Sequence, residues 1–289
     1  MTMDNKDNRD NKTIHPKRLT KADIAKLRAS LPKTLDLSAA GVKTDREIED
    51  ILKGSEGEIS VPLSAETIRD LLKYADMLKE KNKVMNLTAI TDDEGIAMKH
   101  FIDSLTIASF IDKEQAGKKN GKVSLIDVGT GAGFPGIPLK INKRDLDLTL
   151  LDSLAKRLKF LEEVADELKL EDVHYLHARA EDAGNDVKYR EKFDIATARA
   201  VASLPVLCEY CLPFVRKGGC FIAMKGKLEE ELGSAEKAIK ILGGKTEEVR
   251  EFTLPGTDME RTIIVIRKVK ETPKRYPRQA GRPSRDPIA

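Results

Sequence analysis

The sequence predicts an α/β fold: a doubly wound, mostly parallel sheet with a closing antiparallel hairpin, preceded by a small helical subdomain. Three observations predict it. Residues 123–136 read as an apolar strand that runs into a glycine-rich turn. Strand-like and helix-like segments then alternate as far as residue 242, as they do in parallel sheets covered by helices. The strand-like segments 246–254 and 260–267 follow one another around the turn PGTDM, which predicts an antiparallel pair at one edge.

Residues 1–60 form an N-terminal extension to which we assign no chemistry. Residues 1–18 are rich in Asn, Asp and Lys, and such a composition predicts disorder. Short helices are expected over 19–31, which ends at a Leu-Pro step, and within 41–57, around Ile48.

A helical cap subdomain is predicted over residues 61–118. Ser64 can cap a helix that runs to about Asn82, because its apolar residues recur at helical spacing. A second helix is predicted over 93–110 by the same criterion. The charged, glycine-containing run GKKNGK then links this subdomain to the sheet.

The sheet domain is predicted over residues 119–268, and a basic extended tail over 269–289. Its strands are expected at 123–128, 147–152, 173–178, 193–198, 219–224, 246–254 and 260–267. Its helices are expected at 136–142, 154–169, 203–212 and 228–242. The tail is rich in Pro and Gly, which argues against a regular helix there.

The glycine-rich turn is the first candidate binding element. Gly129, Gly131 and Gly133 allow a tight turn and leave no side chain between its backbone and a ligand. The spacing from Gly131 to Gly136 also satisfies the dinucleotide fingerprint, so a nicotinamide-dependent dehydrogenase stays an alternative, as does a turn without a ligand.

Two residues beside this turn favour S-adenosylmethionine over a dinucleotide. Asp127 ends the strand, where a carboxylate can face the cationic amino group of a methionine moiety but would repel a pyrophosphate. Pro135 removes one N–H that a diphosphate would otherwise use at the helix start. We therefore expect a sheet of the S-adenosylmethionine-dependent methyltransferase type.

Ligands of open α/β sheets lie beyond the carboxyl ends of the strands, so residues at those ends are candidates for the site. Asp152 follows the second strand and can accept hydrogen bonds from two ribose hydroxyls, although it could also cap the next helix. Arg199 follows the fourth strand and needs an anionic partner, either a ligand group or a carboxylate of the fold.

Four further segments carry a resemblance to a known family. They read TLLDSLAKRLKFLEEV at 149–164, HARAED at 177–182, DIATARAVASL at 194–204, and the ending TPKRYPRQAGRPSRDPI. With the glycine turn, they resemble the RsmG or GidB family of small-subunit ribosomal RNA guanine-N7 methyltransferases from about residue 60 to the C-terminus. The resemblance implies S-adenosylmethionine as cofactor and 16S ribosomal RNA, or the small ribosomal subunit, as partner.

The resemblance also implies roles for residues that patterns alone leave open. Ala180 and Glu181 match the family's contacts to the adenosine end of the cofactor, and Phe134 and Arg199 match further cofactor contacts. His100, in KHFIDS, matches the helical region that would cover the active site, so we name His100 and Arg199 as candidate catalytic residues. Without the resemblance, a packed histidine, a core phenylalanine and an internal salt bridge explain these side chains equally well.

Basic residues mark a candidate RNA-binding surface. From Arg267 to the end there are eight Lys or Arg against two acidic residues. Within that segment, and at the end of the fifth strand, the expected RNA contacts are Lys225, Lys227, Lys274, Arg275, Arg278 and Arg282. A solvated terminus and a solvated strand edge are the alternatives.

Composition excludes several classes. The net charge is only +3, which by itself does not indicate a nucleic-acid-binding protein. No apolar run is long enough for a membrane helix, and the first residues lack the apolar centre of a signal peptide, so we expect a cytoplasmic protein. We also expect a monomer. His174 and His177 are three apart on a strand and point to opposite faces, so no metal site is expected. Cys208 and Cys211 lie in a predicted helix without thioredoxin context, which favours core packing.

The expected reaction needs little from the protein besides positioning. Guanine N7 keeps an in-plane lone pair, so it can attack a methyl group without first losing a proton. The lack of an Asn-Pro-Pro-Tyr run or an obvious nucleophile agrees with this chemistry. A methyltransferase acting on another substrate and a non-catalytic RNA-binding module stay open as alternatives.

Overall fold

The computed structural model describes residues 46–59, 61–118, 121–199, 202–227 and 231–288. The chain divides into two compact units, Met1–Lys43 and Thr44–Ala289. The first unit lies outside the described residues, and so do the disorder and the helix that we expected within it. In the described ranges, no helix is long and apolar enough to cross a membrane.

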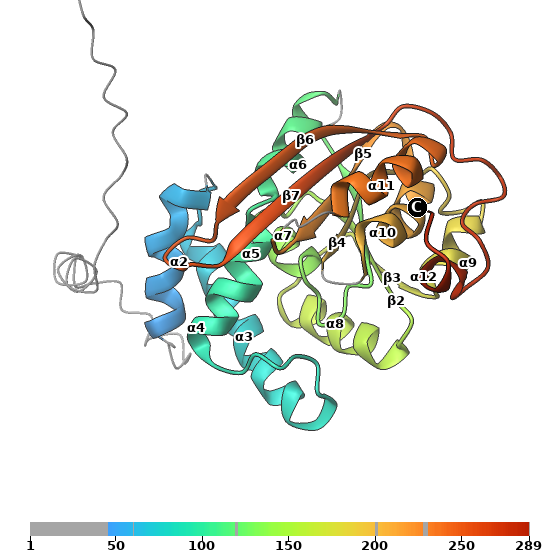
Figure 1. Cartoon of the computed structure of the whole chain (residues 1–289). Coiled ribbons are helices and arrows are strands. Elements are labelled where there is room, and N and C mark those ends of the chain that lie inside the picture. Colours follow the sequence, from blue (N-terminus) through green and yellow to red (C-terminus); the bar gives the residue numbers. More distant parts are fainter. Residues whose placement is uncertain (1–45, 60, 119–120, 200–201, 228–230, 289) are drawn as a thin grey trace, which may run out of the picture. The chain divides into compact units, whose positions relative to one another are not determined.

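The second unit is built on a seven-stranded sheet with the order β3-β2-β1-β4-β5-β7-β6 (Figure 1). Strands β1 to β5 are parallel, and β7 runs antiparallel to both β5 and β6. The predicted fold class is therefore confirmed, including the closing hairpin. The strands are β1 (Ser124–Val128), β2 (Asp147–Asp152), β3 (Val173–His177), β4 (Phe193–Arg199), β5 (Val215–Lys225), β6 (Gly244–Thr253) and β7 (Glu260–Lys268).

The sheet separates two hydrophobic cores, because successive residues of a strand point to opposite faces. In β1, Leu125 belongs to one cluster and Ile126 to the other. Helices α7 and α8 supply the first cluster, and helices α10 and α11 the second. The covering helices are α7 (Gly136–Asn142), α8 (Ala155–Glu167), α9 (Ala180–Asn185), α10 (Leu204–Cys211), the 3-10 turn η3 (Leu212–Phe214) and α11 (Glu231–Ile241).

The helical subdomain packs into the first of these cores. Ser64 caps α3 as predicted, accepting a hydrogen bond from the N–H of Thr67 at 3.0 Å. Ile48 and Leu52, on α2, are fully buried in the same cluster, so α2 belongs with these helices although we had placed it in the extension. The subdomain consists of α2 (Arg46–Ile59), α3 (Ala65–Met85), α4 (Asp93–Gly95), the π-helix η2 (Ile96–Ile102), α5 (Asp103–Leu105) and α6 (Ala108–Ala116).

The single helix predicted over 93–110 is wrong in one respect. Its middle turn is a π-helix, and the chain starts a new helix at Ala108. At this break the Oγ1 of Thr106 donates to the carbonyl of Asp103 at 2.6 Å, a bond that competes with regular helical bonding. A π-turn changes the direction of the side chains that follow it, and such turns often mark functional sites.

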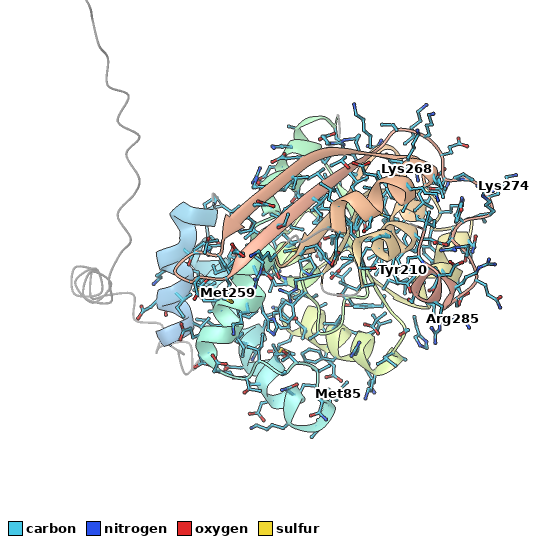
Figure 2. All side chains as sticks on the ribbon, in the orientation of Figure 1. Met85, Tyr210, Met259, Lys268, Lys274 and Arg285 are labelled. Carbon is cyan, nitrogen blue, oxygen red and sulfur yellow. The ribbon has the colours of Figure 1, made fainter. Side chains whose placement is uncertain are left out.

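The tail does not extend from the domain as expected. It folds back over α9 and α10, buries Pro277, Pro283 and Ile288, and includes the helical turn α12 (Arg282–Arg285) (Figure 1). Arg190 donates to the carbonyls of Thr272 at 2.7 Å and of Tyr276 at 2.8 Å. Arg190 thus supplies hydrogen bonds to two carbonyl groups of the tail, and the composition of the tail gave no sign of this partner. Lys274 and Arg285 lie at the periphery of this part of the molecule in Figure 2.

Candidate active site

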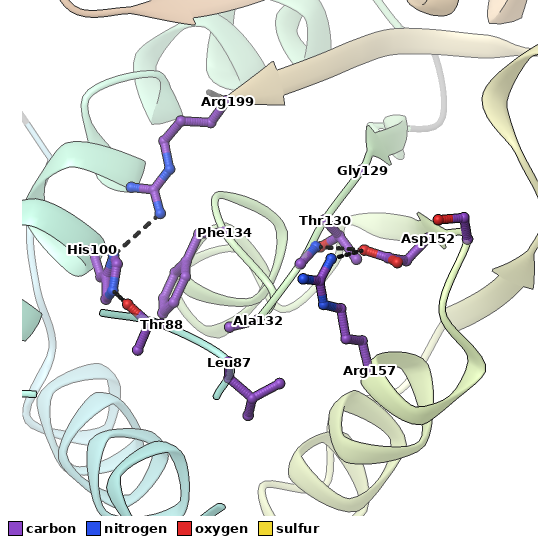
Figure 3. A pocket seen from close by; sticks show the side chains of 12 residues that line it. Leu87, Thr88, His100, Gly129, Thr130, Ala132, Phe134, Asp152, Arg157 and Arg199 are labelled. Atoms are coloured by element: carbon purple, nitrogen blue, oxygen red, sulfur yellow. Dashed lines mark hydrogen bonds and ion pairs between the residues drawn. The ribbon is translucent and has the colours of Figure 1, made fainter. Parts of the chain in front are cut away.

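A cavity of about 390 Å³ opens at the carboxyl ends of β1, β2 and β4 (Figure 3). β1 has β2 on one side and β4 on the other, so the cavity lies where the strand order reverses, as predicted for a ligand site. Its wall comprises Leu87, Thr88, His100, Gly129, Thr130, Gly131, Ala132, Phe134, Asp152, Ser153, Arg157 and Arg199.

The glycines of the turn serve two different purposes. A methyl group on Gly131 would meet no atom closer than the carbonyl oxygen of Gly129, at 3.9 Å, so space is left on the cavity side. A methyl group on Gly133 would lie 2.6 Å from the hydroxyl of Tyr74 and 2.7 Å from Leu161. Gly129 and Gly131 therefore shape the cavity, whereas Gly133 permits close packing of the turn against α3 and α8.

Asp152 accepts hydrogen bonds from two nearby backbone N–H groups and does not cap α8, whose N-cap residue is Leu154. Its Oδ2 accepts a hydrogen bond from the N–H of Gly131 at 3.0 Å, and its Oδ1 accepts one from the N–H of Leu154 at 2.9 Å. Arg157 approaches Oδ2 at 3.4 Å from the first turn of α8. The carboxylate thus joins the end of β2 to the glycine turn and stays in the cavity wall.

Asp127 does not line the cavity, contrary to the expectation that it faces a ligand amine. It is fully buried, and its Oδ2 accepts hydrogen bonds from the hydroxyl of Thr130 at 2.7 Å and the N–H of Gly136 at 3.0 Å. Its Oδ1 is the only buried side-chain nitrogen or oxygen without a partner among the described residues. Burial raises the pKa of Asp127 to about 6. Asp127 therefore holds the two ends of the glycine turn together.

Ala180 and Glu181 also lie outside the cavity wall. Glu181 is 4% exposed, and its Oε1 accepts a hydrogen bond from the N–H of Gly281 at 2.8 Å. The carboxylate that the resemblance assigned to the cofactor is thus engaged by the tail. The short helix α9, which we did not predict, begins at these two residues and carries this contact.

His100, Phe134 and Arg199 come together at the other end of the cavity from Asp152 (Figure 3). The rings of His100 and Phe134 stack with centroids 4.2 Å apart, and the guanidinium carbon of Arg199 lies 5.1 Å from the Phe134 centroid. Arg199 also donates to Nδ1 of His100 at 3.3 Å and to Oδ2 of Asp103 at 2.9 Å. The π-turn η2 brings Lys99 and His100 to the end of β4.

His100 is neutral in this environment. Burial, followed by the charge of Arg199, lowers the pKa of His100 to about 3. An imidazole with so low a pKa is a poor general base at neutral pH. Its role is therefore geometric, through the ring stacked on Phe134 and the hydrogen bond to Thr88.

Four residues that support the cavity escaped prediction. Arg157 and Thr88 line it, Tyr74 donates to the carbonyl of Ala132 in the glycine turn, and Arg261 donates to Oδ1 of Asp103 at 2.8 Å. Tyr74 carried only the signal of helical spacing. Arg261, on the antiparallel strand β7, carried none, because its partner lies 158 positions away.

The predicted RNA-binding cations fall into two groups. Lys225 donates to the carbonyl of Ala202 at 3.0 Å and pairs with Glu231, and Arg278 pairs with the buried Glu209, so neither is free to meet a ligand. For these two the prediction does not fit the geometry, because their partners belong to the fold. The exposed members of the set are Lys227, Lys274, Arg275 and Arg282.

Within the described part of the chain, no group of His, Cys, Asp and Glu could hold a metal ion. His174 binds Asp147 at 3.0 Å, whereas His177 binds the carbonyl of Ser153 at 3.1 Å. Cys208 and Cys211 are free and buried in α10, and burial raises the pKa of both thiols. The core-packing interpretation of these two cysteines is confirmed.

The chain is similar to known methyltransferases of ribosomal RNA. The family model described as rRNA small subunit methyltransferase G matches residues 67–263. A ribosomal RNA small subunit methyltransferase G from Acetivibrio thermocellus is 55% identical over 82% of this chain and 95% of its own length. The protein of the same name from Alkaliphilus oremlandii is 51% identical over 84% of this chain and 99% of its own length.

Among solved structures, the chain matches a precorrin-6y C5,15-methyltransferase from Geobacter metallireducens. It is 15% identical, with a TM-score of 0.44, over 63% of this chain and 98% of the other.

Proposed function

Because the chain belongs to the rRNA small subunit methyltransferase G (GidB) family, we propose that the cavity beside Gly131 is where a methyl group passes from S-adenosylmethionine to N7 of a guanine in 16S ribosomal RNA. The family carries out this S-adenosylmethionine-dependent reaction on the small-subunit RNA.

One observation carries the assignment. A single cavity joins a glycine turn and the strand-end carboxylate of Asp152 at one end to the stacked pair of Phe134 and His100 at the other. A carboxylate with acceptor capacity suits ribose hydroxyls, and an aromatic face suits either a base or the apolar part of a methionine chain. The cavity therefore offers chemistry that suits both reactants.

The residues present fit the cofactor. We propose that Gly129, Gly131 and Asp152 hold its nucleoside and that Phe134 and Arg199 hold its amino-acid end, because Arg199 is the cation of that end. When bound, S-adenosylmethionine supplies an electrophilic methyl carbon. Asp127 supports this site by fixing the glycine turn, whereas Glu181 fixes the tail to α9.

Catalysis then consists mainly of positioning. Guanine N7 needs no deprotonation, and the neutral His100, whose pKa is about 3, offers no effective base. Holding two reactants in line can lower the barrier by about 7–11 kcal/mol. His100 and Arg199 would contribute by fixing the plane of Phe134 and the charge beside it.

We propose that the RNA backbone contacts the exposed cations Lys227, Lys274, Arg275 and Arg282. Of these, Lys274 and Arg275 lie on the tail just before Tyr276, whose ring has the guanidinium of Arg275 at 5.2 Å from its centroid. We further propose that the protein acts as a monomer in the cytoplasm, where its substrate RNA is found.

The test uses full-length protein, labelled S-adenosylmethionine and small subunits or 16S RNA from cells that lack this protein. Mass spectrometry should find one N7-methylguanine, and calorimetry should detect S-adenosylmethionine binding that Asp152→Asn weakens. Methylation of another atom, or no methylation of the RNA, would contradict the proposed substrate. If S-adenosylmethionine does not bind at millimolar concentration, the alternative of a non-catalytic RNA-binding module would be favoured.

A further inference from the structure

The hydrogen bonds around His100 determine which nitrogen carries its proton. A guanidinium can only donate, so Nδ1 of His100, 3.3 Å from a terminal nitrogen of Arg199, is the acceptor. The neutral ring then carries its proton on Nε2. That N–H donates to the Oγ1 of Thr88 at 2.9 Å.

The hydroxyl oxygen of Thr88 therefore accepts a hydrogen bond from His100, and the hydroxyl proton is left to donate elsewhere. Its Oγ1 also accepts a hydrogen bond from the N–H of Ile90 at 3.1 Å, so both acceptor sites of the hydroxyl are occupied. The hydroxyl can therefore act toward the cavity only as a donor. Thr88 lies in the cavity wall beside Phe134 (Figure 3).

The donor is held in place on both sides. The side-chain amide of Asn82 accepts from the N–H of Thr88 and donates to its carbonyl, each at 2.9 Å. Asn82 belongs to α3, whose Tyr74 also donates to the carbonyl of Ala132 in the glycine turn. Thr88 is thus fixed relative to the cavity by the same helix that fixes the turn.

A hydroxyl that can donate but not accept distinguishes guanine from adenine. Both bases present an acceptor at N7, but guanine has an acceptor oxygen at position 6 where adenine has an amino donor. Resting on the function proposed above, we propose that Thr88 is a specificity-determining residue whose hydroxyl donates to O6 of the target guanine. Adenine is rejected because its amino group would face a hydroxyl with no free acceptor.

The experiment compares Thr88→Val with Thr88→Ser, which keeps the hydroxyl. The substrates are RNAs that carry guanine, or 2-aminopurine in its place, at the methylated position. 2-Aminopurine keeps N7 but lacks the oxygen at position 6. The wild type should favour guanine in kcat/KM, Thr88→Val should lose about ten-fold on guanine and little on 2-aminopurine, and Thr88→Ser should restore the preference.

Two outcomes would overturn the inference. An unchanged preference for guanine in Thr88→Val would show that another group reads position 6. Equal losses on both RNAs, with weaker S-adenosylmethionine binding in calorimetry, would place the hydroxyl on the carboxylate of the cofactor. In either case the wild type still methylates guanine N7, whereas failure of the proposed function would abolish transfer by the wild type itself.

Discussion

Arg278 binds both carboxylate oxygens of Glu209, through Nε at 2.9 Å and a terminal nitrogen at 2.7 Å. Glu209 lies on α10 and is 1% exposed, so this pair anchors the tail to the second core. The backbone N–H of Arg278 donates to the same carboxylate at 2.7 Å. A residue that composition assigned to RNA thus stabilises the fold.

We expect Arg278→Met to lower the free energy of unfolding by about 3 kcal/mol, because it leaves a buried carboxylate without its charged partner. Urea denaturation followed by circular dichroism measures the change. Lys274→Met, on an exposed residue four positions earlier, is the control and should change stability little. Equal stability of the two variants would contradict the anchoring role. A chain truncated after Lys270 would also lack Arg278 and leave Glu209 unpaired, so a loss of activity in it would not separate RNA binding from stability.

The exposed cations should determine the salt dependence of RNA binding. Each of Lys274→Gln, Arg275→Gln and Arg282→Gln should reduce the slope of log K against log salt by about 0.7, the value for one neutralised phosphate of a single strand. Fluorescence anisotropy at several salt concentrations measures the slope. Asp258→Asn, at an exposed acidic position, should leave it unchanged. A slope that stays constant in all three variants would place the RNA elsewhere.

Two glycine substitutions should separate binding from stability. Gly131→Ala places a methyl group on the cavity side at a φ of +61°, so it should weaken S-adenosylmethionine binding and destabilise the fold by only about 1–2 kcal/mol. Gly133→Ala would drive a methyl group into Tyr74 and Leu161, so its loss of stability should be larger. Calorimetry and thermal melting measure the two effects. The reverse order of stabilities would contradict this division of roles.

Asp127 should make stability depend on pH. Burial raises its pKa from 3.8 to about 6, so the folded state holds this proton more tightly than the unfolded state. Stability from this group is therefore present below pH 4 and is lost as the pH rises through 6, by about 3 kcal/mol. Asp127→Asn should remove that loss. Urea denaturation of the wild type and the variant at pH 4 and pH 7 measures how much the free energy of unfolding of each changes between the two pH values. The exposed Asp258→Asn serves as its control, and an unaltered difference would refute the assignment.

The rate of methyl transfer should show no histidine titration. Because the pKa of His100 is lowered to about 3, the ring stays neutral between pH 5.5 and 8. Single-turnover rates on saturating RNA should therefore show the same pH profile across this range in the wild type and in His100→Gln. An inflection that disappears in His100→Gln would instead identify His100 as a base.

The order of strands and helices could be read from local pattern, and so could part of the site. The glycine turn and Asp152 follow strands whose apolar residues mark their length, and parallel strands bring their carboxyl ends to one edge. His100 and Phe134 were chosen through family resemblance, and Arg199 also by its position after the fourth strand; the fold brings the three into contact. Arg261 was missed because a hydrogen-bond partner 158 positions away leaves no local signal, and Thr88 because it lies in the connection after α3, outside any predicted helix or strand.

The sequence by itself determined the sheet, its closing hairpin and the position of the cofactor turn, because hydrophobic period and glycine placement act over a few residues. Only the tertiary structure decided which charged side chains face the cavity. Asp127, Glu181, Lys225 and Arg278 were expected to contact ligands, yet each is bonded within the fold, Asp127 through one of its two carboxylate oxygens. The physical reason is that a buried charge must find its partner in space, and that partner is set by packing rather than by neighbouring residues.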